Sequence, residues 1–175
     1  MPDKKKAKSS PRKDLISQRG RPSRRLYLTS KDLPKKINNY FKRIIELTPT
    51  HYIVHLDISN RNLQDVNIEN YFRLDSFKSL EKLNCSNNRL KTLNIYYLSN
   101  LKILDCSKNF LTNNNAKHQL IIDYNSKLEI LNCGFNKLVY LNIKYNSKLK
   151  KLNCMSNKLK NINLSNNPLL EVLDC

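Results

Sequence analysis

The sequence predicts an α/β fold, in which a solenoid of short parallel strands follows an N-terminal capping helix and a disordered basic tail. Three observations support this prediction. The pattern LxxLxCxxNxL recurs from residue 51 to the end of the chain, and residues 31–50 have the apolar spacing of a helix. Of the 32 Lys and Arg residues, ten lie among the first thirty positions. The chain is therefore divided into 1–30, 31–50 and 51–175.

Residues 1–30 are predicted to be a disordered tail. They are rich in Lys, Arg, Ser and Pro and poor in large apolar side chains, so they cannot bury enough surface to offset chain entropy. The charge run lacks the apolar core of a secretory signal, and Pro2, Asp3 and Pro11 do not suit a mitochondrial presequence. No apolar run reaches membrane-spanning length. We expect an intracellular protein, nuclear or cytoplasmic, that does not bind a membrane.

Residues 31–50 are predicted to form an amphipathic helix that caps the solenoid. Ser30 or Asp32 provides an N-cap, and Pro49 ends the helix. The apolar positions recur at i, i+4, i+7 and i+8. They are Ile37, Phe41, Ile44 and Ile45.

Residues 51–175 are predicted to wind into five full turns and a partial sixth. Successive turns are 27, 21, 27, 21 and 21 residues apart, and the six extra residues of the long turns mark loops. In each "LNC" or "LDC" segment, the flanking Leu and Cys face one way and the Asn or Asp faces the other, as in a strand. The turns begin at Ile53, Leu80, Leu101, Leu128, Leu149 and Leu170.

This pattern resembles that of the leucine-rich-repeat family, whose signature is LxxLxLxxNxL. The second turn matches it, and three later turns match at the corresponding positions, whereas Arg61 replaces the Asn of the first turn. The resemblance implies a curved solenoid of parallel strands that binds other macromolecules, without implying catalysis. The matching residues of the second turn are Leu80, Leu83, Cys85, Asn88 and Leu90.

The cysteines are predicted to fill space in the core, in the inward column that begins with Ile58. Free cysteine behaves there as a small hydrophobe. In-register parallel strands lie about 4.8 Å apart, which is wider than a disulfide prefers. A spacing of 21 or 27 residues also lacks the pairing of a zinc site. The five free, metal-free thiols are Cys85, Cys106, Cys133, Cys154 and Cys175.

The recurring asparagines are predicted to turn inward and bond otherwise unpaired backbone groups between turns. They are Asn88, Asn109, Asn136 and Asn157.

The sequence does not indicate an enzyme. His51 and His55 are spaced as HxxxH, but on a strand this spacing does not make a helical metal pair. The only glycines are Gly20 and Gly134, so a glycine-rich phosphate loop is excluded. We expect no catalytic residue, cofactor, metal or small-molecule substrate.

The stretch "QRGRPSRR" in the tail resembles the AT-hook, whose Arg-Gly-Arg-Pro core lies in the minor groove of A·T-rich DNA. A narrow minor groove concentrates the negative potential that attracts arginine. The alternative is a nuclear-import signal or a solvated tail, to which Lys4, Lys5, Lys6 and Lys8 contribute. The candidate DNA-binding residues are Arg19, Gly20, Arg21, Pro22, Arg24 and Arg25.

Outward positions of the repeats form a candidate protein-binding surface, the alternative being ordinary solubilising charge. One column holds Asp or Asn, and a second group of basic residues follows the recurring Asn. The residues are Asp57, Asn84, Asp105, Asn132, Asn153, Arg89, Lys137 and Lys158.

These features favour a non-enzymatic interaction protein with a protein partner, whose basic tail tethers it to A·T-rich DNA or directs it to the nucleus. One alternative is a DNA-binding or packaging protein that acts through its net charge of +18. A weaker one is a ubiquitin-ligase substrate receptor, since "DLPKKINNYFKRI" faintly resembles the opening of an F-box. We also expect further repeats or a second chain to cover the strand edge at Cys175.

Overall fold

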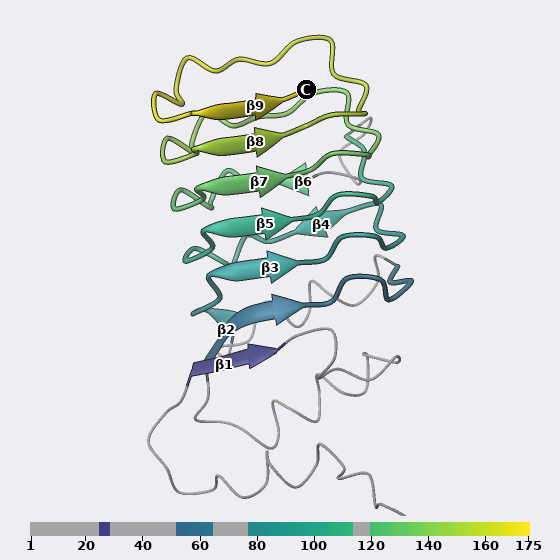
Figure 1. Cartoon of the computed structure of the whole chain (residues 1–175), viewed down its shortest axis with the longest axis vertical. Coiled ribbons are helices and arrows are strands. Elements are labelled where there is room, and N and C mark those ends of the chain that lie inside the picture. Colours follow the sequence, from purple (N-terminus) through teal and green to yellow (C-terminus); the bar gives the residue numbers. More distant parts are fainter. Residues whose placement is uncertain (1–24, 29–51, 65–76, 114–119) are drawn as a thin grey trace, which may run out of the picture.

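The computed structural model describes residues 25–28, 52–64, 77–113 and 120–175. The predicted capping helix, and the predicted tail except Arg25–Leu28, lie outside these residues. In the described part the strands stack one above another along the long axis, from β1 at one end to β9 at the other (Figure 1).

The described residues form two parallel sheets. Seven strands make the larger sheet in the order β1-β2-β3-β5-β7-β8-β9, and β4 pairs with β6 in the smaller one. The strands are β1 (Arg25–Leu28), β2 (Tyr52–Asp57), β3 (Lys82–Asn84), β4 (Leu93–Asn94), β5 (Ile103–Asp105), β6 (Leu120–Ile121), β7 (Ile130–Asn132), β8 (Lys151–Asn153) and β9 (Val172–Asp174).

Strand β1 corrects the prediction that residues 1–30 are disordered throughout. It pairs in parallel with β2, with a register shift between Leu26 and Tyr27. The Tyr27 ring packs edge-on against His55, with centroids 4.6 Å apart. A four-residue strand depends on the hydrogen bonds of its neighbour, and the edge of β2 supplies them. The composition of a thirty-residue window could not reveal this partner.

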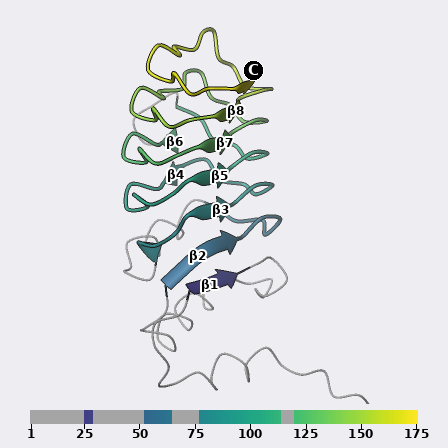
Figure 2. The same ribbon diagram turned by 60° about the vertical axis from the view of Figure 1, so that its left-hand side comes forward.

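The core lies between the two sheets. Strands β4 and β6 lie on the side of each turn away from the larger sheet (Figure 2). Leu83, Leu104 and Leu131 pair in register across β3, β5 and β7, and all three are buried. The repeated inward positions therefore form continuous columns, as the sequence predicted.

Four cysteines form one of these columns, directly above Ile58. Cys85, Cys106, Cys133 and Cys154 are buried free thiols, whereas Cys175 is exposed. Burial raises the pKa of the first three thiols well above its ordinary value. Burial and the adjacent Cys175 raise the pKa of Cys154 to about 12. Their packing role is confirmed.

The recurring asparagines bond the backbone between turns, which confirms a second prediction. Asn109 Nδ2 donates to the carbonyls of Cys85 and Cys106, each at 3.1 Å, and of Ser107. Its Oδ1 accepts from the Leu90 N–H at 3.0 Å. One amide thus joins two consecutive turns. Equivalent bonds are made by Asn88, Asn136 and Asn157.

A second asparagine ladder, which the sequence analysis missed, lies just ahead of the strands. Asn125, Asn146 and Asn167 are buried, and each donates two bonds to carbonyls of the preceding turn. Their Oδ1 atoms have no hydrogen-bond partner among the described residues, so the donated bonds alone offset the burial of these amides. The signal was the recurring "NSKL" and the later "NPLL", each beginning with the ladder asparagine and ending on the first Leu of a turn.

We predict that Asn109→Ala lowers the free energy of unfolding by about 2–4 kcal/mol, because it leaves the Leu90 N–H and buried carbonyls unpaired. Urea denaturation measures the change. The control is Asn100→Ala, which removes two exposed bonds, one donated to the Lys78 carbonyl and one accepted from Lys127 Nζ, and should cost less than about 0.5 kcal/mol. Equal losses in the two variants would contradict the role of the ladder.

We predict that alkaline pH destabilises the protein through its buried thiols. The pKa of Cys106 is raised in the fold above its ordinary value of 9.0, so its stabilising contribution is complete below pH 9.0 and is lost as pH rises toward the folded pKa. Cys106→Ala should reduce the slope of unfolding free energy against pH, above that pH, by up to about 1.4 kcal/mol per unit. Denaturation series at stepped pH measure the slope. An unchanged slope would contradict the prediction.

Candidate interaction surface

The exposed face of the larger sheet, called here the strand face, has a small apolar centre. Lys82, Ile103, Ile130 and Lys151 occupy the same register position on β3, β5, β7 and β8. The two isoleucines are partly exposed and the two lysines are exposed. The centre of the face is therefore apolar and is bordered by cations on both sides.

The predicted Asp/Asn column borders this centre and also shapes the loops. Each side-chain Oδ1 accepts a bond from the backbone N–H two residues later, at 2.9–3.2 Å. This Asx-turn ends each strand and bends the chain into its loop. Its members are only partly exposed, and their role in binding stays a prediction. They are Asp57, Asn84, Asp105, Asn132 and Asn153.

A ladder of alternating charge runs along the opening residues of the strands. Lys102 Nζ lies 3.3 Å from Glu81 Oε2, and Lys150 Nζ lies 2.9 Å from Glu129 Oε2. The hydrogen bond from Lys150 lowers the pKa of Glu129. Glu171 continues the alternation at the same position of the last turn. Exposed pairs contribute little stability, but here they place charges of opposite sign side by side on successive turns.

The loops that follow the strands carry a different set of side chains, called here the loop rim. Two phenylalanines project among cations: the Lys137 Nζ lies 4.9 Å from the centroid of Phe110, and the Lys108 Nζ lies 5.9 Å from that of Phe135. Sequence reasoning identified three of the cations and missed both aromatic residues. The loop rim comprises Arg89, Lys108, Phe110, Phe135, Lys137, Met155 and Lys158, all exposed.

One position of these loops has a left-handed backbone in each of the first five turns. Its φ is 57° at Asn60, 53° at Asn87, 52° at Lys108, 56° at Phe135 and 53° at Ser156. Asparagine tolerates this conformation, whereas a bulky aromatic residue is strained by it.

The opposite corner of the solenoid carries a tyrosine cluster. The ring of Tyr96 lies 4.9 Å from that of Tyr97 and 4.1 Å from that of Tyr124, both centroid to centroid. All three rings are exposed, and their mutual contacts cover part of their apolar surface.

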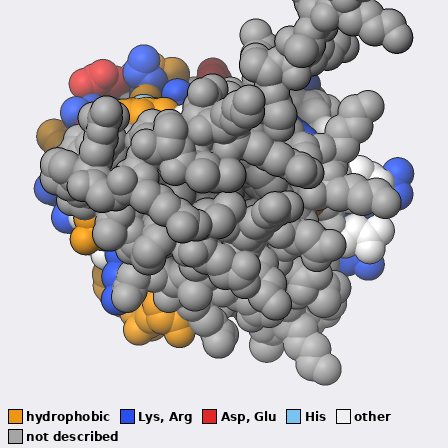
Figure 3. All heavy atoms as spheres, turned by 90° about the horizontal axis from the view of Figure 1, so that it is seen from below, with side chains coloured by type: hydrophobic (Ala, Val, Ile, Leu, Met, Phe, Trp, Pro, Cys, Tyr) orange, Lys and Arg blue, Asp and Glu red, His pale blue; other side chains and the backbone are white. Residues whose placement is uncertain are grey.

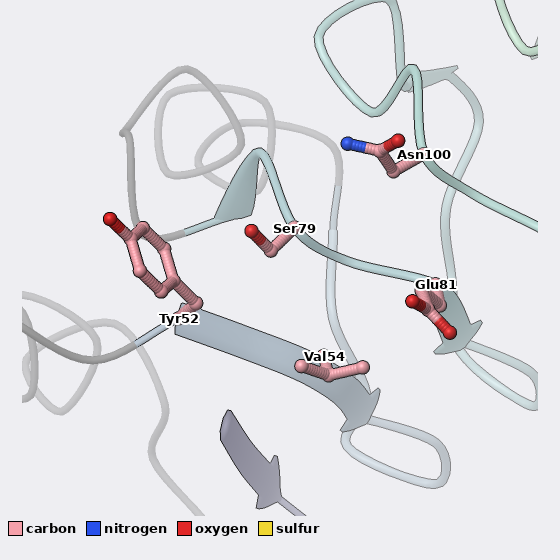
Figure 4. Close-up of a pocket in the computed structure, with 5 residues that line it drawn as sticks. All are labelled: Tyr52, Val54, Ser79, Glu81 and Asn100. Carbon is pink, nitrogen blue, oxygen red and sulfur yellow. The ribbon is translucent and has the colours of Figure 1, made fainter. Parts of the chain in front are cut away.

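A shallow pocket of about 330 Å³ opens beside β2. Figure 4 shows Tyr52 and Val54 on β2, Ser79 and Glu81 on the chain leading into β3, and Asn100 on the next turn. These residues include neither a thiol nor a histidine. Within the described ranges, no three His, Cys, Asp or Glu residues are grouped to hold a metal ion, and no helix is long and apolar enough to cross a membrane.

The predicted tail sites are not tested. Arg25 is the first residue of β1, and the other candidate DNA-binding and nuclear-import residues lie outside the described residues. His51 does as well. Seen along the axis from the β1 end, Lys and Arg side chains of the described residues project at several points around the outline (Figure 3).

Stacked parallel strands, inward leucine and cysteine columns and the bridging asparagine define the class of fold: the chain forms a leucine-rich-repeat solenoid. It is similar to the functional domain of InlJ from Listeria monocytogenes, which includes a cysteine ladder. The two are 27% identical with a TM-score of 0.60, over 70% of this chain and 25% of that one. Cysteines recur here at the same position of successive turns.

A leucine-rich-repeat protein of Leptospira interrogans is also similar in fold, with 21% identity and a TM-score of 0.57 over 85% of this chain and 36% of that one. The chain thus spans about a quarter to a third of the length of these two proteins. No protein-family model and no curated protein sequence matches it. Solenoids of this class use their extended surfaces for binding.

Proposed function

We propose that the solenoid is a non-enzymatic interaction module that binds a protein partner through the strand face. The observation that supports this most is the pair of partly exposed isoleucines, Ile103 and Ile130, between Lys82 and Lys151. Protein interfaces commonly combine an apolar centre with a polar rim. A solvated sheet face without a partner would favour polar residues at its two central strands.

The described residues offer little for catalysis. The buried thiols have raised pKa values and are closed to substrate, so they are poor nucleophiles. Burial, and then the charge of Lys82, lowers the pKa of His55, whose ring lies against Tyr27. Neither feature places a base beside a nucleophile.

A second candidate function concerns the tail, which we propose tethers the protein to A·T-rich DNA or directs it to the nucleus. The Arg-Gly-Arg-Pro sequence and the net charge of +18 support it. A protein that acts mainly on DNA through this charge remains the competing hypothesis, and the two experiments below separate them.

We predict that Ile130→Lys abolishes capture of the protein partner. The variant should fold, because lysine occupies the same register position at Lys82 and Lys151. The full chain is used as bait in nuclease-treated extract, and captured proteins are quantified by mass spectrometry. Tyr145→Asn, on another side of the solenoid, should leave the set and amount of captured proteins unchanged. If Ile130→Lys retained every captured protein, the strand face would not be the binding surface.

We predict that Arg19→Ala with Arg21→Ala weakens binding to an A·T-rich duplex and reduces the salt slope by about 1.8, because two phosphate contacts are lost. Fluorescence anisotropy over a salt series measures both quantities. A G·C-rich duplex is the control and should be affected less. An equal loss of affinity for both duplexes would indicate that the tail binds DNA only as a general basic segment.

A further inference from the structure

We propose that the loop rim is a second binding surface, which takes an acidic segment carrying aromatic or apolar side chains on a protein partner. The loop rim follows the carboxyl ends of the strands and is separate from the strand face. Its charge, its strained aromatic residue, its fixed backbone and its length each support this assignment.

The loops that carry the loop rim, together with the loop of the first turn beside them, have charge of one sign. Five successive loops, residues 59–63, 86–90, 107–111, 134–138 and 155–159, contain five cations and no carboxylate. The charge ladder at the other end of the strands alternates instead. The loop cations are Arg61, Arg89, Lys108, Lys137 and Lys158.

Among the described residues, the strand ends next to these loops carry three carboxylates, those of Asp57, Asp105 and Asp174, against the five loop cations. Asp57 Oδ1 accepts the Ser59 N–H. Asp105 Oδ1 accepts from the Ser107 N–H and hydroxyl, and its Oδ2 accepts from Asn132. These hydrogen bonds hold the carboxylates of Asp57 and Asp105 at the strand ends, where they form the Asx-turns. A negatively charged partner is therefore favoured at the loops.

The position of Phe135 lowers the stability of the fold. Its side chain is 49% exposed and its φ is 56°, where Asn60 and Asn87 stand in earlier turns. An exposed aromatic residue in a left-handed conformation loses backbone energy without burying its ring. Strain of this kind is typical of binding sites, where a bulky side chain serves as an anchor. Phe110 stands on the neighbouring loop, 43% exposed.

The backbone of the loop rim is fixed before any partner binds. Lys108 N–H donates to the Gly134 carbonyl at 3.0 Å, and Phe135 N–H donates to the Met155 carbonyl at 2.8 Å. Phe110 and Lys137 donate in the other direction, to the preceding turns. Since each loop is bonded to both neighbours, little ordering entropy is lost when a ligand binds.

The aromatic geometry favours a peptide over single-stranded nucleic acid. Base stacking needs open ring faces, but the ammonium groups of Lys137 and Lys108 lie over the rings of Phe110 and Phe135. Carboxylates can pair with these lysines without displacing them, while apolar side chains contact the ring edges. Five loops at about 4.8 Å per turn extend about 19 Å, which about six residues of extended peptide would cover.

The test measures fluorescence anisotropy of the full chain with a fluorescein-labelled peptide, Asp-Glu-Phe-Asp-Glu-Phe-Asp. Phe110→Asn with Phe135→Asn should weaken binding at least about tenfold, the size of loss expected at anchor residues. Lys137→Glu should weaken it as well. The matched control, Tyr124→Asn with Tyr145→Asn, also removes two exposed aromatic rings and introduces the residue found at Asn166; it should bind normally.

Thermal unfolding distinguishes a lost binding residue from a lost fold, because Phe135→Asn alone should raise the unfolding midpoint while it weakens peptide binding. Ile130→Lys should leave peptide binding unchanged. The loop-rim proposal can therefore fail independently of the proposal that the strand face binds the protein partner. Peptide binding that survives both loop variants would overturn the proposal, since it would reflect the basic tail. It would also be overturned if single-stranded oligo(dT) bound more tightly than the peptide and lost affinity in the same phenylalanine variant.

Discussion

The hydrogen bonds that join each turn to the next are the interaction on which the rest of the structure depends. A single short turn has little core of its own and ends in a loop whose backbone groups need partners. Asn109 supplies them, since its one amide bonds carbonyls of two turns and accepts an N–H from the earlier turn. Ahead of the strands, Asn146 donates to two carbonyls of the preceding turn. The two ladders therefore hold the turns that begin at Leu128 and Leu149 at both ends of their strands.

The cysteine column follows from this tight spacing. The turns stack at the distance set by the sheet hydrogen bonds, and the inward position after each strand leucine holds an apolar side chain, which is Ile58 in the first turn and cysteine in the later ones. Cys106 is fully buried between Cys85 and Cys133 at this position. Burial keeps the thiols protonated, so they pack as apolar side chains and are poor nucleophiles.

Fixed turns make the outer positions into ordered surfaces. Whatever occupies one position in successive turns is displayed as a column, so charge and aromatic residues accumulate along a line. Glu81 and Lys102 open the charge ladder, in which successive turns carry charges of opposite sign. Lys108 and Lys137 belong to loops with no compensating carboxylate, and they lie over Phe135 and Phe110. The columns whose charge is not balanced internally are therefore the ones that we propose for binding.

The sequence by itself determined the repeat, the inward Leu83 and Cys85 and the bridging Asn88, because these depend on periodicity within one turn. Tertiary structure alone decided which residues meet across turns. Glu129 and Lys150 are 21 residues apart and become neighbours only through strand register. Strand β1 needs the edge of β2, and the strain at Phe135 comes from a loop whose shape is imposed by the turns on both sides. Local patterns record which side of a strand a residue occupies, whereas contacts between turns depend on how the turns stack.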